Sequence, residues 1–194
     1  MKYSVNNVAF FFSKEETPDL WPLSNMTGGM PIYLGKKKFH SSEQLYQACK
    51  YLPDVVCIPE SISDQARGGY EPHVQKRILE SNNARGAKMT QKCAVKAGLI
   101  RADWDEIKVD CMLWVLELKL KWNPKTFGTV LKSTGSKMIV EKSKKDTFWG
   151  CIQKGSVFNG DNQLGRLLVQ VRTNYDRIVN QRILSHPEGF LILL

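Results

Sequence analysis

The chain has 194 residues, which suits a single domain with its own hydrophobic core. Hydrophobic residues make up 42% and charged residues 24%, and no run of about 18 apolar residues is present, so a membrane-spanning helix is not expected. Lys+Arg 28 against Asp+Glu 19 gives a net charge of +9, which favours anionic partners such as phosphates, nucleotides or nucleic acid.

The cysteines and histidines give no sign of a metal site. The five cysteines are an odd number without metal-type spacing, and the three histidines are scattered. Residues 1–7 lack the apolar core of a signal peptide. These features predict reduced thiols, a cytoplasmic location, no membrane association, no metal and no cofactor.

The N-terminal part of the chain predicts short strands followed by a helix. Residues 8–12 form a β-prone apolar run, and residues 31–40 predict a hairpin that turns at Gly35-Lys36. We expect these pieces to form one small antiparallel sheet. Ser41 and Gln44 make a capping-box pattern for a helix that Pro53 ends.

Helices are expected to dominate the rest of the chain. We expect an irregular helical excursion over 54–82, a helix over 84–97 and a long buried helix over 107–120 that a capping box opens at 103–106. The remaining segments predict a short helix, a short strand, a glycine-bearing loop and a last helix, over 124–132, 138–140, 150–160 and 164–171. The prediction is a predominantly α-helical α+β fold with a small antiparallel β-sheet, as one domain over 1–194.

A polar face on the first predicted helix is the first candidate for chemistry. Glu43, Gln47 and Lys50 follow at i, i+4 and i+7 and therefore share one face. Tyr46 and Tyr51 flank this face, and Glu43 lies in the first turn, where the helix dipole favours a carboxylate. The face is either a pocket floor or an ordinary solvent-facing polar strip.

A second candidate lies after the strand over 138–140. Glu141 follows an apolar run, and Asp146 precedes Trp149-Gly150 by three residues. Tryptophan offers a broad face on which a base or ribose can stack, and glycine lets backbone approach a ligand. The alternative interpretation is a core tryptophan beside a turn.

Two weaker candidates complete the set. The loop that carries Asn162 and Gly165 runs into a helix, whose free N–H groups attract phosphate, although an ordinary helix start explains it equally well. Lys88 lies on the middle helix, where a lysine is usually solvated but in a pocket could bind phosphate or act covalently.

Several of these segments resemble, in order, the motifs of one family. The matching segments are Phe11-Phe12-Ser13, Leu23-Ser24-Asn25, the run over 42–50, Ala87-Lys88, Trp104 with Met112, Ile139-Val140-Glu141, Asp146-Thr147-Phe148-Trp149-Gly150 and the run over 162–168. Together they resemble the NADAR family, also called YbiA-like, over roughly residues 9–175. The chain departs from the usual W-G-x-G at Cys151-Ile152, and its stretches 51–82 and 151–160 are longer than in a minimal member.

The resemblance implies a mainly helical domain with N-glycosidase activity and no metal. It implies catalytic roles for Glu43, Lys88, Glu141 and Asp146. It further implies that the substrate is bound by Asn25, Gln47, Lys50, Trp104, Trp149, Gly150, Asn162 and Gly165. One carboxylate would stabilise an oxocarbenium-like transition state and another would serve as acid or base.

The substrate and the class of function stay open at this point. The leading hypothesis is hydrolysis of ADP-ribosylated nucleobases, such as ADP-ribosyl-guanine. A net charge of +9 attracts both a diphosphate and a nucleic acid. The alternative substrates are ribosylaminopyrimidine phosphates of riboflavin biosynthesis. The non-enzymatic alternatives are a module that binds ADP-ribose or NAD and a basic nucleic-acid-binding protein.

Overall fold

The computed structural model describes residues 1–181 and shows a mainly helical α+β domain with three small sheets. The strands are β1 (Lys2–Ser4), β2 (Val8–Phe11), β3 (Ile32–Leu34), β4 (Lys37–Phe39), β5 (Met138–Glu141), β6 (Ile152–Lys154) and β7 (Val157–Asn159). The α-helices are α1 (Ser42–Ala48), α2 (Asp64–Arg67), α3 (Val74–Glu80), α4 (Ala84–Thr90), α5 (Lys92–Lys96), α6 (Trp104–Trp122), α7 (Phe127–Ser133), α8 (Gln163–Thr173) and α9 (Tyr175–Asn180). Two 3-10 turns, η1 (Val5–Asn7) and η2 (Trp21–Leu23), complete the fold.

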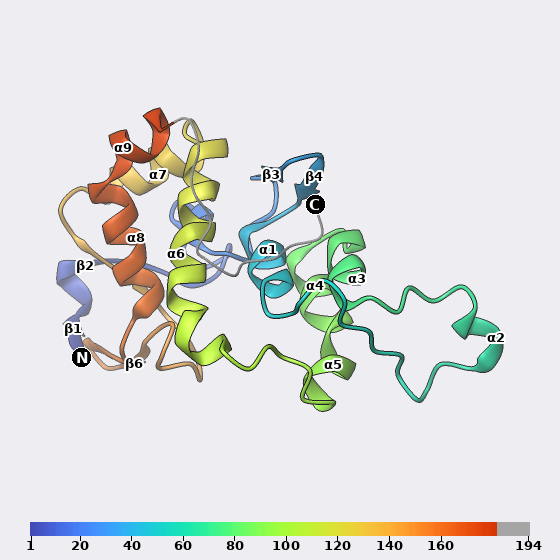
Figure 1. Cartoon of the computed structure of the whole chain (residues 1–194). Helices are drawn as coiled ribbons and strands as arrows, with labels where there is room; N and C mark the ends of the chain where they lie inside the picture. The colour runs from blue at the N-terminus through green and yellow to red at the C-terminus, as the bar shows by residue number, and fades with distance from the viewer. Residues whose placement is uncertain (182–194) are drawn as a thin grey trace.

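Helix α6 is the axis of the domain, with α8 on one side and α1 on the other (Figure 1). Its sequence is apolar almost all round, and side chains such as Cys111, Val115 and Leu120 are fully buried. The sequence therefore correctly predicted a central helix here. The expected capping box at its start does not form, because the Asp103 carboxylate pairs instead with Arg101 at 2.6 Å.

The expectation of one antiparallel sheet from residues 8–12 and 31–40 is wrong. β2 pairs in parallel with β5, far along the chain, while β3 and β4 form a separate antiparallel hairpin. A parallel pair needs cover on its faces, and α8 packs against β5 to provide part of it. This pairing places Glu141 beside Phe11, at the end of β5.

Other segments also differ from the sequence-based expectation, and α1 ends at Ala48 instead of continuing to Pro53. The predicted loop over 150–160 contains the hairpin β6–β7, which turns at Gly155 with φ +59° and pairs with β1. The predicted helix over 84–97 is two short helices, α4 and α5, that meet at Gln91. The break matters because Gln91 turns its side chain toward the candidate site described below.

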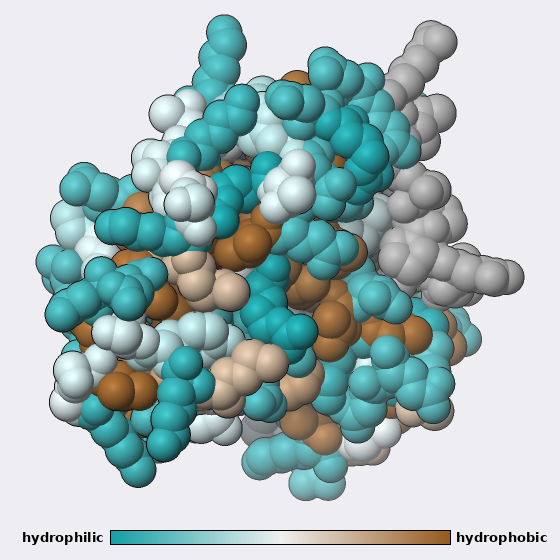
Figure 2. Space-filling view, turned by 90° about the vertical axis from the view of Figure 1, so that its left-hand side faces the viewer, coloured by the Kyte–Doolittle hydropathy of each residue, from teal (hydrophilic) through white to brown (hydrophobic). Residues whose placement is uncertain are grey.

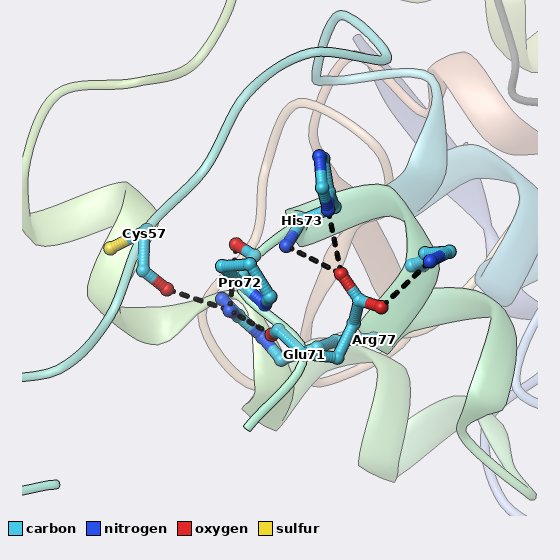
Figure 3. A network of polar contacts seen from close by, with 6 residues as sticks. Cys57, Glu71, Pro72, His73 and Arg77 are labelled. Carbon is cyan, nitrogen blue, oxygen red and sulfur yellow. Dashed lines mark hydrogen bonds and ion pairs between the residues drawn. The ribbon is translucent and has the colours of Figure 1, made fainter. Parts of the chain in front are cut away.

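The stretch over 52–73 extends away from the body of the domain and carries the short helix α2 (Figure 1). Arg77 of α3 ties the two ends of this excursion together, because its Nη1 donates to the carbonyls of Cys57, Glu71 and Pro72 at 2.6, 2.9 and 3.1 Å (Figure 3). Glu71 also accepts from His73 and Lys76. The excursion is thus anchored at its base by one buried guanidinium.

The surface of the domain is mostly polar, as expected for a chain with 24% charged residues. The face in Figure 2 is largely hydrophilic, with apolar side chains scattered between the polar ones, as in most folded domains. Within residues 1–181 no helix combines the length and the apolar character that a membrane crossing requires.

Candidate active site

A cavity of about 530 Å³ lies where α1, α4, α6 and the turn after β5 meet. Its walls come from six places in the chain: the loop after η2, these three helices, the turn after β5 and the start of α8. The lining residues are Ser24, Asn25, Met26, Glu43, Tyr46, Gln47, Lys50, Lys88, Gln91, Trp104, Asp105, Lys108, Met112, Glu141, Asp146, Trp149 and Leu164. The two candidate segments of the sequence therefore face one cavity.

Glu43 lies in the first turn of α1 and is only 5% exposed. Its Oε1 accepts a hydrogen bond from Gln47 Nε2 at 2.6 Å and pairs with Lys88 Nζ at 3.0 Å. Lys88 reaches it from α4 with a half-exposed side chain. The burial of Glu43 and Gln47 excludes the interpretation of this face as a solvent-facing polar strip.

The loop that carries Asn25 fixes the start of α1. The Asn25 carbonyl accepts from the backbone N–H of Glu43 at 3.1 Å, and its side-chain oxygen accepts from Ser42 Oγ at 2.9 Å. Its amide donates to the sulfur of Met112 on α6 at 3.0 Å. Asn25 thus joins α1 to α6 at the cavity, and its own side chain lines the wall.

Lys119 of α6 stabilises the loop that carries Asn25. Its buried ammonium donates to the carbonyls of Pro22 and Ser24, each at 2.8 Å, and lies 4.5 Å from the centre of the Phe127 ring. Burial lowers the pKa of Lys119 to about 7.

Aromatic rings form a second wall. The centre of the Tyr46 ring lies 5.1 Å from that of Trp104 and 5.7 Å from that of Trp149, which meets it edge-on. Lys50 Nζ lies over both Tyr46 and Trp104, at 5.6 and 5.8 Å from the ring centres. Burial lowers the pKa of Lys50, and no carboxylate within residues 1–181 pairs with it, so an anionic ligand would find a ready counter-charge here.

Glu141 lies at the end of β5 in a different environment from Glu43. Its side chain makes no hydrogen bond and no ion pair with the residues that the structure describes. Burial, with the negative charges of Asp146 and Glu43 nearby, raises the pKa of Glu141 to about 7. A carboxyl with such a pKa can carry a proton near neutral pH and give it up during a reaction.

Asp146 stabilises the turn between Glu141 and Trp149. Its Oδ1 accepts from the backbone N–H groups of Phe148 and Trp149 at 2.9 and 2.8 Å. This turn directs the Trp149 ring toward Tyr46. Asp146 is exposed, and its negative charge contributes to the raised pKa of Glu141.

Three predicted ligand-binding residues lie behind the cavity wall instead of in it. A Cβ on Gly150 would lie 2.7 Å from the Glu141 carbonyl, and one on Gly165 would lie 2.1 Å from the Ile139 carbonyl. Asn162 is fully buried with φ +53°, and its side chain donates to the Ile139 carbonyl at 2.8 Å and accepts from Glu141 N at 3.1 Å. These residues fix the end of β5 and so the position of Glu141.

The remaining predicted residues all face the cavity, and several lining residues were missed from the sequence. Gln91 follows Lys88 by three residues, and Lys108 and Met112 follow Trp104 at i+4 and i+8, so helical spacing would have placed them on the same faces. Ser24 and Leu164 lie in segments that match the family motifs, whereas Met26 carries no signal of either kind.

The NADAR domain family matches residues 10–175. The chain belongs to this family. The cavity of this NADAR domain, with Glu43, Glu141 and all three of its helical walls, lies inside the matched range.

Relatives of this NADAR domain carry functional names. It is 38% identical over 80 residues to the chloroplastic riboflavin biosynthesis protein PYRR of Arabidopsis thaliana. This match covers 41% of the chain and 13% of that protein. It is 38% identical over 73 residues to the N-glycosidase Npun_R5314 of Nostoc punctiforme, which covers 38% of the chain and 44% of that protein. Each match therefore spans less than half of the relative's length.

The NMR structure of the Escherichia coli protein YbiA has the same fold. The two structures agree with a TM-score of 0.64 over 93% of this chain and 92% of that chain, at 21% sequence identity. The likeness confirms the prediction of a mainly helical, YbiA-like α+β domain.

Proposed function

We propose that this NADAR domain is an N-glycosidase that hydrolyses the bond between a ribose carbon and a nitrogen of a base. The observation that carries the proposal is a pair of carboxyl groups in contrasting environments in one cavity. Glu43 forms an ion pair with Lys88, whereas Glu141 lies unpaired among the described residues, with its pKa raised to about 7. Such a contrast assigns different roles to two carboxyl groups.

The proposed reaction uses each group once. Glu141 protonates the leaving nitrogen as the C1–N bond breaks, and the Glu43 carboxylate stabilises the positive charge that develops on the ribose. Water then adds to C1 and gives its proton to Glu141, which restores the starting state. The products are the base or nucleoside that carried the ribosyl group and the freed ribosyl portion with its phosphates.

The surrounding side chains fit a flat base and a phosphate. The partly exposed Trp149 offers ring surface on which a base can stack, and Lys50 offers a positive charge without a carboxylate partner in residues 1–181. Lys88 serves here as the counter-ion of Glu43. Its ion pair requires the charged ammonium, whereas a covalent lysine nucleophile attacks as the neutral amine.

For the substrate, we propose an ADP-ribosylated nucleobase, because the +9 charge and the lysines at the cavity favour a diphosphate. A ribosylaminopyrimidine phosphate is the second candidate, and the names of the PYRR relatives favour it. We keep the cytoplasm as the proposed location.

The test incubates the purified full chain with ADP-ribosyl-guanosine and, separately, with a ribosylaminopyrimidine phosphate, and follows products by chromatography. We expect ADP-ribose and unmodified nucleoside from the first substrate. Release only from the second would move the assignment to the riboflavin-type substrate. Unchanged ligand that binds with measurable affinity would show a binding module instead.

The Glu43→Gln variant tests the mechanism. It keeps the size of the side chain and removes its charge, so we expect at least about a 100-fold loss of turnover with an unchanged melting temperature. The matched control is Glu117→Gln, which breaks an ion pair with Arg177 away from the cavity. If Glu43→Gln turns over as fast as Glu117→Gln, the assignment of Glu43 is wrong.

A further inference from the structure

A line of buried polar side chains runs from the cavity into the protein. Gln47 Nε2 donates to Glu43 Oε1 at 2.6 Å, Gln91 Nε2 donates to Gln47 Oε1, and the Tyr51 hydroxyl donates to Gln91 Oε1 at 2.8 Å. All four side chains are 5% exposed or less. The line crosses from α1 to the junction of α4 and α5 and ends at Tyr51, which lies outside the cavity lining.

The chemistry of Glu43 sets the direction of every hydrogen bond in this line. A carboxylate only accepts, so Gln47 must turn its NH₂ group toward Glu43 and its oxygen toward Gln91. Gln91 must then donate to Gln47 and present its own oxygen to Tyr51, which must donate as well. Burial raises the pKa of Tyr51 above its ordinary range, which keeps this last donor protonated.

The line leaves one oxygen of Glu43 available. Lys88 and Gln47 both bind Oε1, and no hydrogen bond from residues 1–181 reaches Oε2. Because Glu43 lines the cavity, Oε2 is the atom that remains for a ligand. The hydrogen bond from Gln47 to Oε1 cannot reverse its direction. It therefore holds Oε1 toward Gln47 and leaves Oε2 to face the substrate.

A neighbouring glutamine shows what an ordinary structural brace looks like. Gln44 of α1 donates to the backbone carbonyls of Ile78, Leu79 and Ser81 and accepts from the backbone of His40. The hydrogen bonds of its side chain all go to backbone and hold α1 to α3. The side-chain hydrogen bonds of Gln47 and Gln91, in contrast, go only to other side chains, and the line that they form ends on a cavity carboxylate.

We infer that Tyr51 and Gln91 are positioning residues that orient the Glu43 carboxylate through Gln47. The inference rests on the proposed function in one respect, namely that Glu43 stabilises the ribosyl cation. Helix α4 then acts on Glu43 at two points, because Lys88 contacts the carboxylate directly and Gln91, one turn later, acts through Gln47. The first contact supplies charge and the second supplies orientation.

The first experiment needs no activity. Side-chain amide signals of Gln47 and Gln91 are recorded by NMR in ¹⁵N-labelled full-length protein, in Tyr51→Phe and in Tyr175→Phe. Tyr175 is the matched control, because its hydroxyl donates to the Pro124 carbonyl at 3.3 Å outside the cavity. We expect both glutamine signals to move in Tyr51→Phe and neither to move in Tyr175→Phe. An unmoved Gln47 signal in Tyr51→Phe would overturn the inference.

The second experiment measures kcat and KM on the substrate that the wild type hydrolyses. We expect loss of the Tyr51 hydrogen bond to lower kcat about fivefold in Tyr51→Phe, and loss of both Gln91 hydrogen bonds to lower it about tenfold in Gln91→Met, with KM nearly unchanged. Tyr175→Phe keeps the wild-type kcat. If Tyr51→Phe does not fold, Gln91→Met gives the same readout from a position at the end of α4.

The outcomes separate the inference from the proposed function. Wild-type kcat in both variants, while Glu43→Gln abolishes turnover, overturns the positioning role and leaves the N-glycosidase proposal intact. A wild type that releases no base from any substrate overturns the proposed function. In that case the amide signals alone decide whether Tyr51 and Gln91 orient Glu43.

Discussion

The two walls of the cavity are built by different means. The wall that carries Glu141 is held chiefly by close backbone packing, because Gly150 and Gly165 pack directly against carbonyls of β5, and the Asn162 side chain binds the same strand. The wall that carries Glu43 is held by side chains, namely Lys88 and the line from Gln47 to Tyr51. The first wall leaves no room for a Cβ at either glycine, whereas the second depends on the direction of its hydrogen bonds.

The difference matches what each carboxyl group would do. The Glu141 side chain makes no hydrogen bond or ion pair with the described residues, and burial keeps its pKa raised. Glu43 is paired and keeps a defined orientation. A rigid backbone wall around an unpaired group and a polar network around a paired one are suitable surroundings for an acid and for a fixed charge.

The largest effect is expected from adding one methyl group to the backbone wall. Gly165→Ala places a Cβ 2.1 Å from the Ile139 carbonyl, so α8 must move away from β5. We expect a loss of about 3 kcal/mol or more in the free energy of unfolding, measured by urea denaturation.

The control for this change is another helical glycine. A Cβ on Gly86 of α4 meets its nearest atom at 3.5 Å, which is an ordinary contact. Gly86→Ala should therefore gain up to about 1 kcal/mol, because alanine favours a helix over glycine. Equal stability of the two variants would contradict the picture of a backbone-held wall.

A smaller effect, with a distinct pH dependence, is expected at Glu141. Its folded-state pKa of about 7 lies above the ordinary value of 4.5, so the folded protein keeps a proton that the unfolded chain releases. The protonated Glu141 side chain makes its full contribution to the free energy of unfolding of the wild type below pH 4.5, and this contribution is lost as the pH rises through 7. Glu141→Gln should therefore be more stable than the wild type at pH 8 by about 2–3 kcal/mol, with a much smaller gap at pH 5.

Melting temperatures at pH 5 and pH 8 measure this difference. Glu117→Gln is again the control, since Glu117 pairs with Arg177 and should show no gain at pH 8. A Glu141→Gln variant with the same advantage at both pH values would mean that burial does not raise the pKa of this group.

The smallest effect is expected at Asp146. Asp146→Asn keeps the side-chain oxygen that accepts from Phe148 and Trp149 and removes the charge that raises the pKa of Glu141. We expect the alkaline limb of the pH–rate profile to move down by about half a pH unit. Asp146→Ala should also change the Trp149 fluorescence, because the turn loses its acceptor. An unmoved alkaline limb in Asp146→Asn would separate Asp146 from the titration of Glu141.

Local patterns in the sequence predicted much of the fold. The apolar residues of α6, the hairpin β3–β4 and the capped start of α1 depend on neighbours within a few positions, and the structure confirms all three. The shared face of Glu43 and Gln47 depends on the same short-range geometry. These features are therefore accessible to reasoning from spacing alone.

Long-range pairing was not accessible in this way. Nothing in residues 8–11 distinguishes a strand that pairs with 37–39 from one that pairs in parallel with 138–141. The same limit hid the role of Asn162, whose side chain binds the backbone of β5 instead of capping α8. It also hid the hydrogen bond that Gln91 makes, since its partner Gln47 lies on another helix.

The parallel pairing of β2 with β5 also governs when the domain can fold. The strands near the start of the chain, β1 and β2, find their partners only in residues 138–159. Contacts between such distant segments close large loops and slow folding. During synthesis on the ribosome, the early helices can form first. The wall that carries Glu141 can form only after residues 138–159 have been made. The cavity is therefore among the last parts of the domain to assemble.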